Sequence, residues 1–288
     1  MTATMPRVAA ADLKKHLERV VGERSPATSP AHLQIVEDYI EAEFKGLGLG
    51  VESDRFVYSG KNFRNIIARA GGASRAPLII LGAHFDSVGG SPAADDNASG
   101  VAVLLEAARI LSRLRLPSPI TFCAFNLEEL NMIGSAHFAK RLKAEGTQVA
   151  AMVSLEMLGY TDPRPGSQKY PVGLGWMYPN RADFIGIIGN RRSASLLHRF
   201  AGAMRQIDGL PVETLTVFGN GFLVPQVRLS DHAPFWDLGY PALLLTDTAF
   251  MRNPHYHRPS DTIDTLDLEF MAKVCDGVVN AVVTLATA

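Results

Sequence analysis

The stretch Pro77-Leu-Ile-Ile-Leu-Gly-Ala-His84 is continuously apolar until its last residue. Such a run, without alternation of polar and apolar residues, is expected of a strand buried on both faces of a sheet. Two similar runs follow along the chain, at Ile120–Phe125 and Ala150–Leu155. Segments with helical periodicity, over about 98–114 and 135–143, separate the three runs. This alternation predicts βαβ units and a mostly parallel sheet with helices on both faces.

The same alternation continues toward both ends of the chain. Apolar residues at helical spacing predict further helices, and short apolar or alternating runs predict further strands. The expected helices lie at about 13–21, 33–44, 193–204 and 267–285, and the expected strands at 51–58, 63–70, 184–188 and 242–245. No internal repeat, linker or low-complexity tract interrupts the 288 residues. We therefore expect an α/β protein with a single domain over residues 1–288.

Composition excludes several classes of function. The chain has 28 Lys and Arg against 29 Asp and Glu, so it lacks the positive field that binds a phosphate backbone. No window approaches the roughly 18 apolar residues of a membrane span. The N-terminal residues lack the apolar segment of a secretory signal, which favours a cytoplasmic location. Cys123 and Cys275 are too few for a disulfide scaffold and are expected in the core. The oligomeric state cannot be read from the sequence.

Two stretches do not fit the alternation of strands and helices. Residues 161–183 are rich in proline, glycine and aromatic residues, and residues 217–230 are similar but shorter. Long ordered loops of this kind are often functional. Two interpretations stay open for both stretches: a packed surface loop, or a wall of a substrate pocket.

Polar residues gather where the buried runs end. His84 and Asp86 close the first run, and their spacing of two places them on the same side of an extended segment. A carboxylate there can accept a hydrogen bond from a metal-bound histidine, although the pair alone is more often structural. Glu128 and Glu129 follow the second run, and Glu156 follows the third. Because ligands of open α/β sheets bind beyond the carboxyl ends of the strands, these acids indicate a site.

Two further segments add candidate ligands. Asp95 and Asp96 directly precede a predicted helix, where capping accounts for one carboxylate but not for two. The loop Asn253–Thr262 carries His255 and His257, which compete for a functional role, and Asp261, which suits a turn or cap. Several carboxylates with histidines and no thiolate form a set that suits Zn²⁺, with carboxylates able to bridge two ions.

Six segments of the chain resemble the M28 family of dizinc aminopeptidases, in the family's order and spacing. They are GAHFDS, DDNASG, NLEEL, SLEMLG, SDHAPFW and YHRPSDT. The resemblance covers nearly the whole chain and is strongest at 82–159 and 230–267. It implies a three-layer α/β/α sandwich with a mixed, mostly parallel central sheet, as in zinc-dependent exopeptidases. It also implies hydrolysis of the N-terminal peptide bond of peptides with a free N-terminus, by a water that two metal ions activate.

The resemblance implies a role for eight residues. His84, Asp96 and Glu156 would hold one Zn²⁺, while Asp96, Glu129 and His257 would hold the second. Glu128 matches the general base, Asp86 the hydrogen-bonding partner of the histidine ligand, and Tyr256 an oxyanion-stabilising tyrosine. Glu156 departs from the family, which usually has aspartate there, and this puts the occupancy of its ion in doubt. Mn²⁺ or Co²⁺ could replace zinc in such a ligand set.

Other functions remain open on the same fold. A glutaminyl cyclase keeps similar ligands around a single zinc ion but releases ammonia instead of hydrolysing a peptide bond. An amidohydrolase, dipeptidase or carboxypeptidase would share the metal chemistry. A catalytically inactive binding module would have degenerate ligands, whereas every ligand-type position is filled in this chain.

Overall fold

The strands form one mixed sheet in the computed structural model, which describes residues 7–71 and 76–287. Their order in the described part is β1-β2-β4-β3-β5-β8-β6-β7. The bounds are β1 Gly50–Tyr58, β2 Lys61–Ala70, β3 Leu78–His84, β4 Ile120–Phe125, β5 Val149–Glu156, β6 Ile185–Asn190, β7 Val212–Val217 and β8 Ala242–Thr246. The central strands β4, β3, β5 and β8 run parallel, whereas β2 and β6 join them antiparallel. The predicted mixed, mostly parallel sheet is confirmed.

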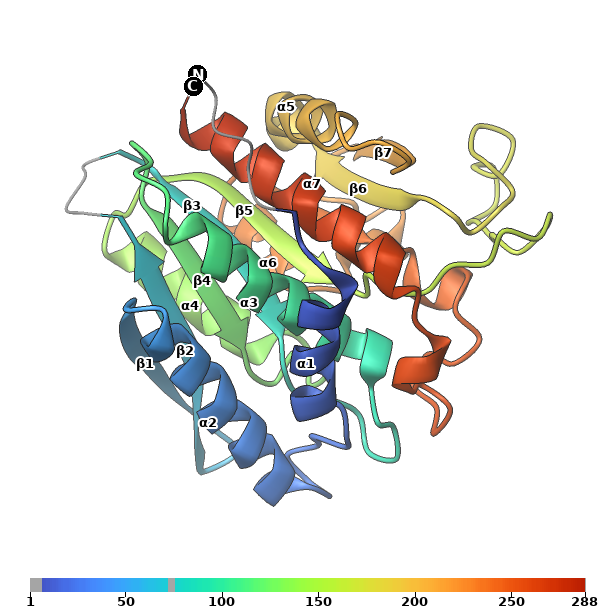
Figure 1. Cartoon of the computed structure of the whole chain (residues 1–288). Coiled ribbons are helices and arrows are strands. Elements are labelled where there is room, and N and C mark those ends of the chain that lie inside the picture. The colour runs from blue at the N-terminus through green and yellow to red at the C-terminus, as the bar shows by residue number, and fades with distance from the viewer. Residues whose placement is uncertain (1–6, 72–75, 288) are drawn as a thin grey trace.

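Helices cover both faces of this sheet and complete a three-layer α/β/α sandwich (Figure 1). One face carries α1 (Ala10–Val20), α2 (Pro30–Gly46), α3 (Gly100–Leu111), α5 (Ala194–Met204) and α7 (Leu268–Ala286). The other carries α4 (Ile133–Ala144) and the short α6 (His232–Asp237). Each face therefore has its own hydrophobic core.

The strongly apolar helix α3 is buried on nearly all sides. Almost every residue of α3 is buried, since this helix lies between the sheet and the helices α1 and α7. Both cysteines are free and buried, as expected of core residues. In the part of the chain that the structure describes, no helix combines the length and apolar character needed to cross a bilayer.

Two elements were not predicted, and one was predicted too long. The strand β7 and the helix α6 lie where the sequence pattern is weak. The helix expected from residue 98 begins at Gly100, because residues 94–99 form a separate turn that holds Asp95 and Asp96. That turn places two carboxylates at the carboxyl edge of the sheet.

Candidate metal centre

The predicted ligands come from five places that meet at the carboxyl edge of the central strands. His84 is the last residue of β3 and Glu156 the last of β5, while Glu129 follows β4. Asp96 lies in the turn before α3, and His257 lies in the loop between β8 and α7. Because parallel strands end at the same edge, segments far apart in the sequence converge there.

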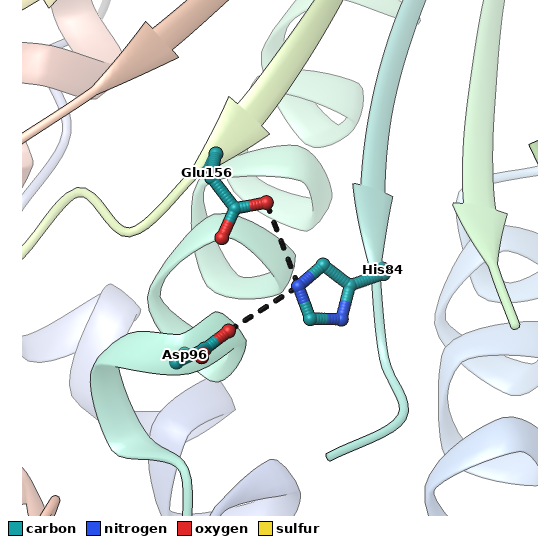
Figure 2. Close-up of side chains that lie close together, drawn as sticks. All are labelled: His84, Asp96 and Glu156. Atoms are coloured by element: carbon teal, nitrogen blue, oxygen red, sulfur yellow. Dashed lines mark ion pairs between the residues drawn. The ribbon is translucent and has the colours of Figure 1, made fainter. Parts of the chain in front are cut away.

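The first group consists of His84, Asp96 and Glu156 (Figure 2). The Nε2 atom of His84 lies 3.3 Å from Oδ1 of Asp96 and 3.5 Å from Oε2 of Glu156. All three residues are buried. The three side chains point toward one another from a strand end, a turn and a neighbouring strand end, as a shared ligand requires.

The second group consists of Asp96, Glu129 and His257. The Nε2 atom of His257 lies 3.0 Å from Oδ2 of Asp96 and 3.2 Å from Oε2 of Glu129. Asp96 thus faces one histidine with each of its two oxygens. Five predicted ligands therefore form two adjoining groups that share one carboxylate.

The unsatisfied atoms of this cluster fit a metal site. The Nε2 atom of His84 and the Oε1 atom of Glu129 are buried without a hydrogen-bond partner in the described part of the chain. Buried polar atoms are nearly always hydrogen-bonded in proteins, so one unsatisfied atom in each ligand group indicates a missing ligand there. Imidazole nitrogens and carboxylate oxygens together are a donor set that suits Zn²⁺.

The charges of the cluster lead to the same conclusion. Burial raises the pKa of Glu128 well above its usual range, and the nearby carboxylate of Glu156 raises it further against the pull of His84. Burial and the charge of Asp96 raise the pKa of Glu129 to about 7. Burial would lower the pKa of His84, but the carboxylates of Glu156 and Glu128 raise it well above normal. The acids exceed the cations that the chain provides here, and bound divalent ions would balance them.

Asp86 connects the first strand end to the glutamates of the second. Its Oδ1 and Oδ2 atoms accept the backbone N–H groups of Glu128, at 3.0 Å, and of Glu129, at 3.2 Å. Oδ1 also lies 3.5 Å from Nδ1 of His84. Asp86 is fully buried and fixes both glutamates relative to the histidine.

Two residues outside the predicted set support the ligands. Asp261 is buried and accepts the backbone N–H groups of Asp95 and Asp96, so it caps a turn more than 160 positions earlier in the chain. The Ser230 hydroxyl donates to Oε2 of Glu156 at 2.7 Å, which fixes the longer side chain at this position. Sequence reasoning placed Ser230 in a family segment but gave it no role.

The remaining candidates, Asp95, His255 and Tyr256, lie outside both ligand groups. Asp95 joins neither group; it accepts the N–H of Gly159 and the side-chain amide of Asn253 and so holds two loops. His255 also lies outside both groups, and its ring bonds to Ser260. Tyr256 stacks on the ring of His257, with the ring centroids 3.8 Å apart, and lies beside the centre.

A cavity of about 120 Å³ adjoins the centre. Glu156 and Tyr256 line its near end, and apolar side chains line most of the rest. Its walls include Tyr170, Leu174 and Tyr178 from one irregular stretch and Val224 from the other. Of the two open interpretations of these stretches, the structure favours a pocket wall.

Sequence comparison now identifies the family. Residues 65–282 match Peptidase family M28. The chain belongs to this family. It is 37% identical over 276 residues to the uncharacterized protein YfbL of Escherichia coli, an alignment that covers 92% of this chain and 84% of YfbL. As an M28 member, the chain is a hydrolase that acts on peptide bonds.

Solved structures agree on the fold of this M28 peptidase. The LapA aminopeptidase of Legionella pneumophila superposes with a TM-score of 0.78 at 22% identity, over 98% of this chain and 73% of LapA. A zinc aminopeptidase of Bacillus subtilis, BSAP, gives a TM-score of 0.62 at 26% identity, over 80% of this chain and 52% of BSAP. A glutaminyl cyclase of Porphyromonas gingivalis gives 0.72 at 20% identity, over 95% and 97%. The fold alone therefore does not separate peptidase from cyclase chemistry.

Proposed function

We propose that this M28 peptidase is an aminopeptidase that holds two Zn²⁺ ions and removes the N-terminal residue of peptides. One observation carries the proposal: two three-residue ligand groups share Asp96, which faces a different histidine with each oxygen. A single ion would use one group and leave the other group's buried acids uncompensated. His84, Asp96 and Glu156 would hold one ion, and Asp96, Glu129 and His257 the other.

Bound zinc would polarise the carbonyl of the scissile bond and lower the pKa of a water molecule to about 7. The residues of the chain supply the rest. Glu128 belongs to neither ligand group, yet its carboxylate lies 3.9 Å from Nε2 of His84 in the first group. Burial raises the pKa of this carboxyl, which makes it a stronger base than an exposed glutamate. Glu128 would take the proton of the water and pass it to the departing amine.

Two more features support cleavage at a free N-terminus. The surplus of carboxylates around the centre can bind a protonated α-amine, which a residue inside a chain does not have. Tyr256 is held beside the centre by its stacking on His257 and would donate a hydrogen bond to the developing oxyanion. Burial and the charge of Asp96 raise the pKa of this tyrosine, so the hydroxyl keeps its proton.

An assay with aminoacyl p-nitroanilides tests this function. We expect release of p-nitroaniline from unblocked substrates, loss of activity with a chelator, and recovery when zinc is added. N-acetylated anilides should not be cleaved, because they lack the free amine. Hydrolysis that resists chelation would contradict the proposal. Ammonia release from an N-terminal glutaminyl peptide, with all anilides intact, would instead assign the chain to cyclase chemistry.

A further inference from the structure

Four residues form a row across the sheet, from the metal centre to its outer strand. Glu156 of β5 pairs with Thr246 of β8, Thr246 pairs with Gly186 of β6, and Gly186 pairs with Glu213 of β7. Directly paired residues share a face of the sheet, so both glutamates lie on the face that α4 and α6 cover. Three strand spacings separate their Cα atoms by roughly 14 Å.

The cavity beside the metal centre lies along this row. Glu156 and Glu213 are the charged residues among those that line it. Between them stand a threonine and a glycine, and a Cβ atom on Gly186 would already lie 3.3 Å from the carbonyl oxygen of Thr246. The small residues in the middle of the row leave a channel from one glutamate toward the other.

The walls of the channel are aromatic and apolar. The rings of Tyr170 and Tyr178 stack with centroids 5.7 Å apart, and both line the cavity. Their hydroxyls donate to the backbone carbonyls of Pro179 and Thr214, so these tyrosines offer their rings and not free hydroxyls. Such walls suit a chain of methylene groups and can also interact with a cation.

Glu213 is half-buried at the far end, and its side chain has no hydrogen-bond or ion-pair partner among the described residues. Its carboxylate acts electrostatically on the pocket wall, since burial and the charge of Glu213 together raise the pKa of Tyr178. The guanidinium of Arg252 lies over the ring of Phe184 in the same wall, and its Nε and Nη1 atoms donate to Gln168 and to the carbonyl of Phe184. Its Nη2 atom has no hydrogen-bond partner in the described part of the chain, and the guanidinium forms no ion pair with Glu213 there. A carboxylate in apolar surroundings without a cation is ready to bind one.

We propose that this cavity receives the side chain of the substrate's N-terminal residue and that Glu213 selects lysine or arginine there. The inference rests on the aminopeptidase function proposed above. The methylene groups of such a side chain would pass Gly186 and the two tyrosines, and its cationic end would meet Glu213. Leucine would fill only the near part of the channel, and an acidic side chain would be repelled.

Anilides of lysine, arginine, norleucine and glutamate test the inference, because norleucine has the chain length of lysine without the charge. We expect the wild type to prefer lysine over norleucine in kcat/KM. Glu213→Gln should lower this lysine-to-norleucine ratio by about tenfold or more, since a charge-assisted pair is lost at nearly constant shape. Glu213→Lys should reverse the charge preference and raise the glutamate-to-lysine ratio. Glu269→Gln, at an exposed glutamate of α7, is the matched control and should keep the wild-type ratios.

Two outcomes overturn the inference in distinguishable ways. If norleucine anilide is cleaved but both Glu213 variants keep the wild-type ratios, the selectivity is wrong while the aminopeptidase function stands. If the zinc-loaded wild type cleaves none of the anilides, the proposed function fails and this inference fails with it. Circular dichroism and thermal melting of each variant show whether it is folded, and a reversed preference in Glu213→Lys cannot arise from unfolding.

Discussion

Two acidic clusters of the molecule differ in the cations that contact their carboxylates. In the Arg64 cluster, the guanidinium of Arg64 bridges Glu37, Asp38 and Glu41, which come from α2. In the metal-centre cluster, Asp96, Glu128, Glu129 and Glu156 surround His84 and His257 and contact no arginine or lysine side chain in the described structure. The first cluster carries its own permanent cation. The second has only histidines, which become cations because the surrounding carboxylates outweigh burial and raise their pKa.

The pKa values of the acids also differ between the Arg64 cluster and the metal-centre cluster. Hydrogen bonds from Lys45 and Arg64 lower the pKa of Glu41. Burial raises the pKa of Glu128, Glu129 and Glu156, whereas for Asp96 the hydrogen bonds from His257 and His84 outweigh burial and lower the pKa. Glu41 ionises easily beside the cations of its own cluster, whereas the three glutamates of the other cluster resist ionisation unless an external cation is bound. The comparison teaches that the missing charge, more than the number of acids, marks a metal site.

The largest effect is expected from Glu128→Gln. This change removes the proposed base, which belongs to neither ligand group, so kcat/KM should fall by about 10²–10⁴-fold. Zinc content should stay at the wild-type level, as elemental analysis of the purified variant will show. Activity near that of the wild type would exclude Glu128 as the base, and loss of zinc would make it a ligand instead.

Zinc binding is expected to have a smaller effect, an increase in thermal stability whose size depends on pH. The folded, metal-free protein binds protons at Glu129, whose pKa is raised from 4.5 to about 7, and at His257, raised from 6.5 to about 10. Its stability should therefore fall as pH rises from about 5 to 8, because the unfolded chain releases these protons earlier. Zinc bound at the proposed centre would replace the protons and remove that loss.

Melting curves with chelator and with zinc measure this effect. The difference in Tm should widen from pH 5.5 to pH 7.5 and reach roughly 5–10 °C when zinc is at about 100 times its Kd. The variant His257→Ala should narrow the difference at pH 7.5. A difference that is constant, or that shrinks as pH rises, would contradict the account of the cluster.

The smallest effect is expected from Arg64→Met. It leaves the buried carboxylate of Glu37 without its cation and that of Glu41 with Lys45 alone, and should lower the free energy of unfolding by about 1–2 kcal/mol. Denaturant titrations at pH 7 should give the same loss with chelator and with zinc, because this cluster binds no metal. Arg64→Lys is the control and should recover part of the loss. A loss that zinc reverses would remove the distinction between the clusters.

Most of the fold, and the side chains that the structure brings together as candidate ligands, could be predicted from the sequence for one physical reason. Central strands are buried on both faces, so their apolar runs are conspicuous and the polar residue that ends each run is conspicuous too. His84 and Glu156 were found in this way, and the structure brings both together with Asp96. The loop sequence left the choice between His255 and His257 open, and the family resemblance favoured His257. The structure agrees with the resemblance, because His257 lies in a candidate ligand group and His255 does not.

The features that were missed depend on partners distant in the sequence. Strand β7 lies at the edge of the sheet and is buried mainly at its two ends, so its pattern is weak. Helix α6 includes Pro234 and has only six residues, so it is too short to show a helical period. Without β7, the alignment of Glu213 with Glu156 across the sheet could not be seen, and no local pattern links Asp261 to the turn of Asp96.

The number of zinc ions per chain tests the central claim most directly. Native mass spectrometry of the zinc-loaded protein should give two ions for the wild type and for His255→Ala, whose histidine lies outside both groups. His257→Ala, which removes a ligand of one group, should retain one. A wild type that binds a single ion, or a His257→Ala variant that still binds two, would contradict the account.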